Sequence, residues 1–375
     1  MKKSIHFLQA SLIPASVLGG GILIVVAGIY KFATGEHMFD TAFFGGDGTN
    51  TLELITYHTL ALLHRLGLQA REGQADEKAH GRDLQHGRDH RLDLSAPGRV
   101  RARDIHSRGA CRDGLFPAAG ILLPFGYGQG TGQALNYGGI FENDFGFVGG
   151  KSFGLTIAAL GFLSASIGGV IHLNIQKKLG RIKITHPEEK VLRSEQIQSD
   201  DEIPMQESID KLTIQIALIA VAYLLAYLLM VALGKLLPSM KSVIFGFNFL
   251  LGVLTATLVK LVMGWLKKKG VIKKEYTNSF LMTRASNFFF DIMVVAGIAA
   301  IRFSVLKDYW GIILIMGVVG LVITYVYNYI VAKKLFPEYT EEQFLTMYGM
   351  LTGTASTGVI LLREIDGEFK TPALD

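Results

Sequence analysis

The chain has 375 residues, half of which are hydrophobic, and its mean hydropathy is +0.34. Soluble domains are more polar, so this composition argues against a soluble protein and indicates a membrane protein with several spans. The net charge of +5 then indicates basic cytoplasmic loops rather than nucleic-acid binding, and a single cysteine excludes an internal disulfide.

The N-terminal apolar segment has two interpretations. Met1-Lys2-Lys3 followed by an apolar run resembles a signal peptide, but Leu12–Phe32 has about 20 residues, which is long enough to cross a bilayer. No small-residue cleavage site follows a short apolar core. We therefore predict a first membrane span here, whereas the apolar segment Leu52–Leu63 is too short for another.

Residues 65–114 differ abruptly from the rest of the chain, because ten arginines crowd this segment and it holds no aromatic residue. One interpretation is a basic cytoplasmic or nucleic-acid-binding loop. A second is a zinc site, although the spacing of its candidate ligands matches no standard pattern. Those ligands are His80, His86, His90, His106 and Cys111.

The third interpretation is that residues 65–114 are translated in the wrong frame. The sequence His-Gly-Arg-Asp at residues 80–83 recurs at residues 86–89. Read one base later, the codons of Gly, Arg and Asp encode mainly Val, Ala, Gly, Thr and Ile, which is the composition of a membrane helix. We favour this hypothesis, and the sequence of the coding DNA tests it.

Five further apolar segments are long enough to span a bilayer. They are Phe153–Ile175, Leu212–Leu236, Val243–Leu266, Asn278–Ile301 and Tyr309–Ala332. Basic clusters follow three of them, at residues 177–193, 267–274 and 333–334. The positive-inside tendency predicts that these loops, including the polar linker 176–211, are cytoplasmic.

Two stretches, residues 125–134 and 349–358, depart from the composition of a lipid-facing helix in the same way. Both are rich in Gly and small polar residues, and each contains a Gly-Thr step. Gly weakens helices and polar groups are unfavourable in hydrocarbon, so such backbone is expected only where protein or a watery cavity surrounds it. Its occurrence in both halves predicts a transporter site built by internal repeat.

The ends of broken helices can bind both an anion and a cation. Backbone N–H groups at a half-helix N-terminus favour a carboxylate, while unwound carbonyls and hydroxyls can coordinate sodium. The candidate ligands are Gly128, Gln129, Gly130, Thr131 and Gln133 in the first stretch, and Thr352, Gly353, Thr354, Ser356 and Thr357 in the second. Close helix packing and a channel filter are the alternative explanations of these residues.

Asp291 lies well inside the predicted span Asn278–Ile301. An intramembrane carboxylate is a functional candidate by default, so we expect Na+ at Thr131, Thr354 and Asp291. The alternative for Asp291 is a protonated, hydrogen-bonded packing residue. We find no metal set, catalytic triad or cofactor loop in a proper context, so we do not expect an enzyme.

Three segments together resemble the bacterial sodium/glutamate symporter family. Residues 12–20 resemble its early helix, residues 128–134 its first glycine-rich hairpin tip, in which His is common where Gln129 stands, and residues 353–356 its second tip. The resemblance implies an all-α inverted-repeat transporter fold with two re-entrant hairpins, Na+ as the coupling ion, and glutamate or a related dicarboxylate as substrate. It also implies a multi-pass protein of the bacterial inner membrane, and it leaves a homodimer open.

This interpretation divides the chain into five parts. Residues 1–64 start the first repeat, 65–114 are anomalous, 115–175 hold the first re-entrant hairpin and the following helix, 176–211 are the linker, and 212–375 form the second repeat. Compared with the family, we expect sequence to be missing at both ends. A channel and a non-functional fragment are therefore the alternatives to a symporter.

Overall fold

The computed structural model describes residues 13–60, 62, 116–182, 210–272, 274, 276–353, 355–366 and 371–374. Within these ranges the chain forms α-helices, short 3-10 helices and turns, and no strand. The arginine-rich segment 65–114 with its histidines and Cys111 lies outside the described residues, as do most of the linker 176–211 and Thr354. The frame-shift hypothesis therefore stays a prediction.

Six helices in the described part of the chain are long and apolar enough to cross a membrane, and each coincides with a predicted span. They are α2 (Ala15–Thr34), α6 (Gly150–Lys178), α7 (Lys211–Leu236), α9 (Asn248–Lys268), α10 (Ser279–Ala299) and α11 (Trp310–Leu335). Helix α9, which corresponds to the predicted span Val243–Leu266, starts five residues later than predicted. The reason is that the backbone leaves the helical conformation at Phe247, after the short helix α8 (Lys241–Gly246).

Much of the apolar surface of these helices is not covered by protein. Only 22% of the most apolar stretch of α7 is buried, and the value for α11 is 28%. Contiguous apolar surface of this extent is unfavourable in water and favourable in lipid. The protein is therefore an all-α membrane protein with several spans.

The described helices fall into two compact units. The first unit holds residues 13–57, 116–182 and 293–374, and the second holds residues 58–62 and 210–292. The first unit contains α2, α5 (Leu122–Phe145), α6, the end of α10, α11, α12 (Thr340–Thr352) and α13 (Ala355–Arg363). The second unit contains α7, α8, α9 and most of α10.

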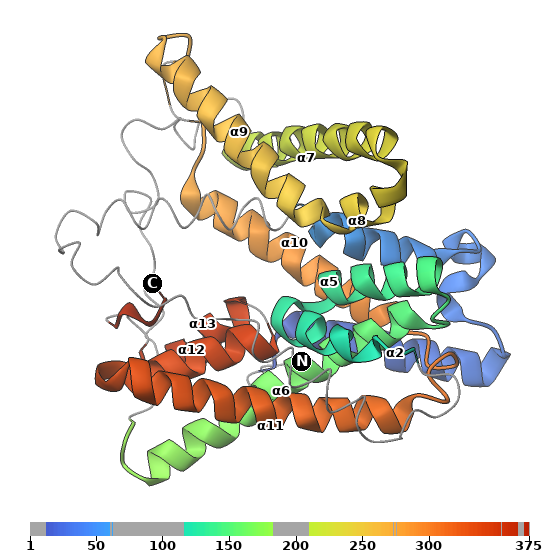
Figure 1. Cartoon of the computed structure of the whole chain (residues 1–375), viewed down its shortest axis with the longest axis vertical. Coiled ribbons are helices and arrows are strands. Elements are labelled where there is room, and N and C mark those ends of the chain that lie inside the picture. Colours follow the sequence, from blue (N-terminus) through green and yellow to red (C-terminus); the bar gives the residue numbers. More distant parts are fainter. Residues whose placement is uncertain are drawn as a thin grey trace. The chain divides into compact units, whose positions relative to one another are not determined.

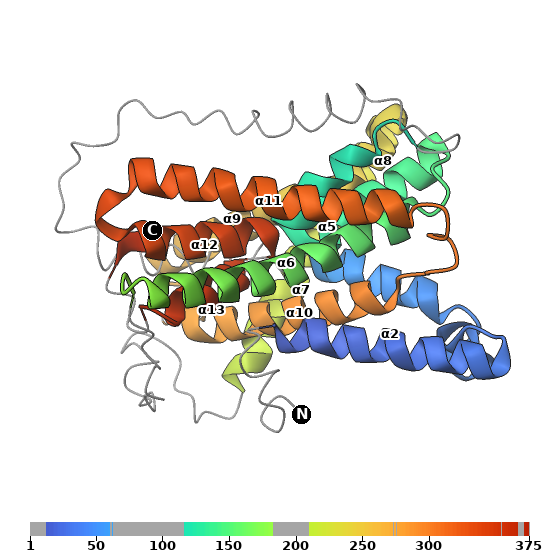
Figure 2. The same cartoon turned by 90° about the horizontal axis from the view of Figure 1, so that it is seen from below.

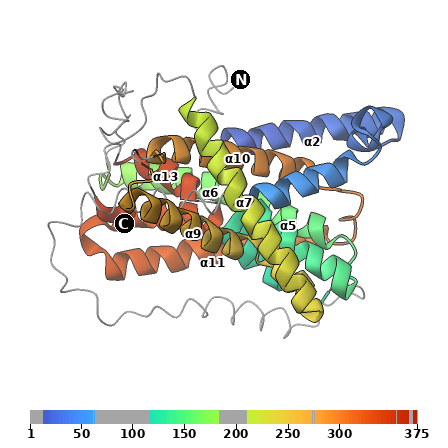
Figure 3. The same ribbon diagram turned by 90° about the horizontal axis from the view of Figure 1, so that it is seen from above.

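In the second unit, α7 crosses α9, and α7 also fixes the start of α10 (Figure 3). Thr255 on α9 donates a 3.1 Å hydrogen bond to the carbonyl oxygen of Ala222 on α7. The fully buried amide of Gln215 donates to the carbonyl of Tyr276 at 2.7 Å and accepts from the backbone N–H of Asn278 at 3.2 Å. A buried side chain thereby satisfies backbone groups before α10 begins.

In the first unit, α11, α12 and α6 lie in successive layers (Figure 2). A core between these helices and α13 contains Leu173, Ala332, Phe344, Leu345, Tyr348 and Leu361, with partly buried tyrosines from α11 around it. Burial of large apolar and aromatic side chains supplies the packing between these layers. This unit contains both glycine-rich stretches.

Candidate functional site

The first glycine-rich stretch folds back on itself. Helix α5 is interrupted at Gly130, whose φ of 72° and ψ of −161° are accessible in practice only to glycine. The rings of Phe125 and Tyr137 stack with centroids 3.8 Å apart, although twelve residues of straight helix would separate them by about 18 Å. The chain therefore reverses at Gly130, and we call residues 122–145 hairpin 1.

The second stretch also separates two paired helices. Helix α12 ends at Thr352, Gly353 is non-helical, and α13 starts at Ala355. The arms lie side by side in Figure 1, and their backbones touch, because a Cβ atom on Gly349 would lie 2.6 Å from the Cα atom of Gly358. We call residues 340–363 hairpin 2.

Both hairpins pack on one glycine face of α6. Gly154, Gly161 and Gly168 are seven residues apart and therefore share a helix face. A Cβ atom on Gly154 would overlap the carbonyl oxygen of Ala134 in hairpin 1, and one on Gly168 would overlap the hydroxyl of Tyr348 in hairpin 2. Hairpin 1 thus covers the N-terminal half of α6 and hairpin 2 the C-terminal half.

The two hairpins meet at Gly161. A Cβ atom there would lie 2.6 Å from the carbonyl oxygen of Thr352 and 3.3 Å from the Cα atom of Tyr127. Gly161 is eleven residues after Gly150, or about 17 Å along the axis, and is therefore near the midpoint of α6. The break of hairpin 2, and a residue three positions before the break of hairpin 1, are accordingly brought to the middle of a helix that is long enough to span a bilayer.

Two buried tyrosines fix this arrangement. The hydroxyl of Tyr127 donates to the carbonyl of Gly317 on α11 at 2.7 Å and lies 3.1 Å from Oγ of Ser164 on α6. The hydroxyl of Tyr348 donates to the carbonyl of Ser164 at 2.8 Å. Neither tyrosine was among the predicted site residues, because the only local signal of each is an aromatic hydroxyl within a small-residue segment, which needs a partner when it is buried.

Most of the predicted ligands that the structure describes are buried at the two tips. Thr131, Gln133 and Thr352 are fully buried, Thr357 is 2% exposed, and Gly130 and Gly353 are buried. In contrast, Gly128 is half-buried and Gln129 is exposed. Thr354 lies outside the described residues, and for Ser356 only its place at the start of α13 is described. Asp291 is exposed on α10 and belongs to the second unit.

Gln133 carries a buried donor that the protein does not satisfy. Its Oε1 atom accepts from Nδ2 of Asn136 at 3.2 Å, but its Nε2 atom has no hydrogen-bond partner among the described residues. A buried donor without an acceptor costs about 1–3 kcal/mol of stability. Gln133 lies three residues after the break at Gly130, so the first tip presents an amide that can donate to an anionic oxygen.

The tips also present hydroxyl and carbonyl oxygens. Oγ1 of Thr131 is 3.5 Å from the carbonyl oxygen of Met293, and Oγ1 of Thr352 donates to the carbonyl of Tyr348 in its own helix. The described residues contain no group of three or more His, Cys, Asp and Glu side chains that could hold a metal ion. A cation at the described part of the tips would therefore be held by neutral oxygens, which suit a hard monovalent ion.

The geometry defines the class of protein as a multi-span α-helical membrane protein with two broken helical hairpins that meet on a central helix. No family model, curated protein or solved structure matches the chain.

Proposed function

We propose that the protein is a sodium-coupled secondary transporter that takes up glutamate or a related dicarboxylate across the bacterial inner membrane. The observation that carries the proposal is the meeting of hairpins 1 and 2 at Gly161, midway along α6. Broken helices at this depth are typical of transporter sites reached alternately from the two sides of the membrane.

The charge pattern supports opposite entry of the two hairpins. Lysines end α6 and also α11, after which hairpin 2 begins, so the positive-inside tendency puts hairpin 2 on the cytoplasmic side. Hairpin 1 ends just before the opposite end of α6, so we infer that it enters from the outer side. Two hairpins that enter from opposite faces are the expected product of an inverted repeat, and we infer that both are re-entrant.

The chemistry of the tips suits an anionic substrate and a small cation. The second arm of hairpin 1 begins after Gly130, and the backbone N–H groups of a helix N-terminus, together with the amide of Gln133, suit a substrate carboxylate. The oxygens of Thr131, Thr352 and Thr354 suit Na+, and the carboxylate of Asp291 is a separate candidate ligand for the same kind of ion. If the substrate and Na+ bind together at the hairpin tips, their binding is coupled, as symport requires.

The test is uptake of radiolabelled glutamate by vesicles that contain the purified full-length protein. We expect glutamate to accumulate above its external concentration with an inward sodium gradient, and not with a potassium gradient of equal strength. Uptake that ignores sodium would exclude the coupling. Fast flux without accumulation against a gradient would instead identify a channel.

A further inference from the structure

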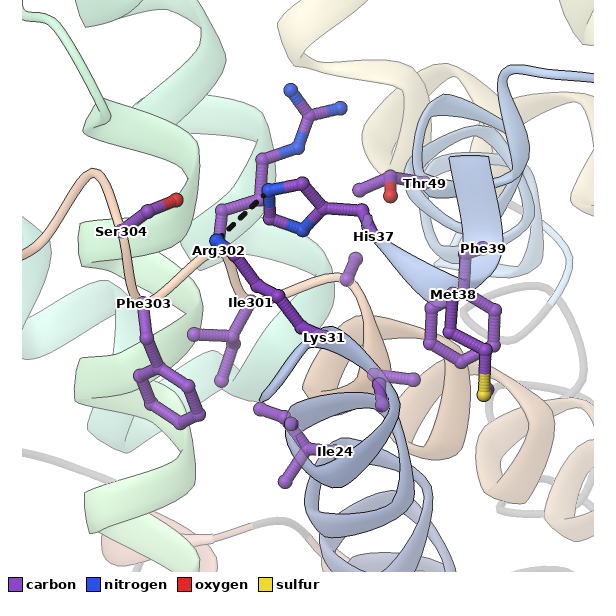
Figure 4. Close-up of a pocket in the computed structure, with 14 residues that line it drawn as sticks. Ile24, Lys31, His37, Met38, Phe39, Thr49, Ile301, Arg302, Phe303 and Ser304 are labelled. Carbon is purple, nitrogen blue, oxygen red and sulfur yellow. Dashed lines mark hydrogen bonds between the residues drawn. The ribbon is translucent and has the colours of Figure 1, made fainter. Parts of the chain in front are cut away.

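A second polar site in the first unit shares no residue with the hairpins. It is a pocket of about 70 Å³ between the C-terminal part of α2, the turn that follows it and the segment after α10. Figure 4 shows Lys31, His37 and Arg302 together in the upper part of the view and Ile24 below them, with Ile301 and Phe303 along one side. The pocket therefore joins a basic part to an apolar part, and we call it the basic pocket.

The basic side chains of the pocket make no direct ion pair within the described part of the chain. Nζ of Lys31 lies 3.1 Å from Nε2 of His37, and no carboxylate among the described residues lies within ion-pair distance of Lys31 or Arg302. Nε of Arg302 is buried without a hydrogen-bond partner there, while its backbone N–H is held by Ser152 at 3.1 Å. The backbone of Arg302 is thus fixed, and the unpaired Nε–H group of its guanidinium can donate a hydrogen bond to an anion.

Asp40, an acidic group that acts electrostatically on Arg302, is already engaged. Asp40 accepts a 3.0 Å hydrogen bond from the backbone N–H of Thr49. Burial raises the pKa of the Asp40 carboxyl, but the hydrogen bonds from Thr49 and the positive charge of Arg302 outweigh it, so this pKa lies below its ordinary value. Asp40 is therefore ionised at neutral pH and satisfied by Thr49, and it does not occupy the pocket.

The surroundings of the basic pocket indicate which kind of anion it would bind. Basic residues cluster before α10, so the positive-inside tendency puts Arg302, at the other end of this helix, on the outer side of the membrane. The same end of α2 exposes a strip of large apolar side chains, with Val25 60%, Ile29 64% and Phe32 94% exposed. Acyl chains would cover this strip, and a pocket of about 70 Å³ has room for a small charged group next to it and not for a whole lipid.

We propose that the basic pocket binds the phosphate group of an anionic membrane phospholipid, with the acyl chains along the exposed face of α2. Lys31 and Arg302 would neutralise the phosphate, since Arg matches its oxygens with paired donors and Lys acts as a point charge. The lipid would thereby hold the end of α2 against the segment that follows α10.

The experiment measures the thermal unfolding midpoint of the purified full chain in neutral detergent during separate titrations. These use phosphatidylglycerol, phosphatidylcholine, inorganic phosphate and glutamate. We expect phosphatidylglycerol to raise the midpoint with saturation and the other three to have little effect. Inorganic phosphate acting as strongly as phosphatidylglycerol would overturn a lipid site in favour of a free-anion site, and an equal effect of phosphatidylcholine would overturn a charge-selective site.

Matched variants locate the effect. Arg302→Gln should weaken the apparent affinity for phosphatidylglycerol about tenfold, the loss expected for one charge-assisted hydrogen bond. Lys307→Gln removes the same charge from an exposed position in the same segment and should leave the affinity unchanged. Equal behaviour of the two variants would refute the pocket. If Arg302→Gln does not fold, Lys31→Gln with native mass spectrometry of retained phosphatidylglycerol gives the same test.

Discussion

Gly161→Ala disturbs the point at which the two hairpins meet. The added methyl carbon would lie 2.6 Å from the carbonyl oxygen of Thr352, whereas non-bonded atoms prefer about 3.5–4.0 Å, so hairpin 2 must move by roughly 1 Å. Overpacking of this kind costs about 1–3 kcal/mol, while Ala is about 1 kcal/mol better than Gly within a helix. The net loss of folding stability is then about 0–2 kcal/mol, which leaves the protein folded with its tips displaced.

Transport should respond more strongly than stability. A displacement of 1 Å at a site that depends on positioning can lower a rate by about 100-fold, so we expect the initial rate of sodium-driven glutamate uptake to fall at least about tenfold. The assay is vesicle uptake normalised to protein, together with the thermal unfolding midpoint of each preparation.

Gly264→Ala is the matched control. Gly264 is exposed on α9, and a Cβ atom there meets nothing within 4 Å, so this variant should gain up to about 1 kcal/mol of stability and transport normally. If Gly161→Ala also transports normally and unfolds at the wild-type temperature, the hairpins do not meet at Gly161 and the reasoning fails.

Three further substitutions test individual parts of the structure. Gln133→Leu removes the unpaired buried donor but also the oxygen that accepts from Asn136, so these two effects on stability oppose each other and the midpoint should change little, while the glutamate concentration for half-maximal uptake increases; an unchanged glutamate concentration would remove Gln133 from the substrate site. Thr131→Val should raise the sodium concentration needed for half-maximal uptake with expression intact, and unchanged sodium dependence would remove Thr131 from the ion site. Glu341→Gln weakens the 2.6 Å pair with the buried His172 and should cost about 1–3 kcal/mol in thermal unfolding, whereas Glu342→Gln, whose side chain makes no such pair, should cost little.

The spans and the interruptions could be predicted because both are local properties of the sequence. Runs of about 20 apolar residues identify α2 and the other long helices, and the helix-weakening Gly130 and Gly353 identify the two breaks. The start of α9 was misplaced because hydropathy does not register the change of backbone conformation at Phe247.

The packing between the hairpins could not be predicted, because it depends on contacts distant in the sequence. The spacing of Gly154, Gly161 and Gly168 is visible in the sequence, yet nothing local indicates that Ala134 and Thr352 approach them. The same holds for the buried His172, which is 1% exposed and bonded to Tyr325 and Glu341, both more than 150 residues later in the chain. The role of Asp291 stays a prediction.

Cross-linking within α5 tests most directly whether hairpin 1 exists, and the meeting of the tips depends on it. The variant would carry Phe125→Cys and Tyr137→Cys in a Cys111→Ser background, treated in native membranes with a short reagent that joins two thiols. Because the two rings stack in the folded chain, we predict that intact-mass measurement finds a single bridging reagent. Two separate adducts, as expected for thiols about 18 Å apart on a straight helix, would contradict the reversal at Gly130 and with it the proposed site.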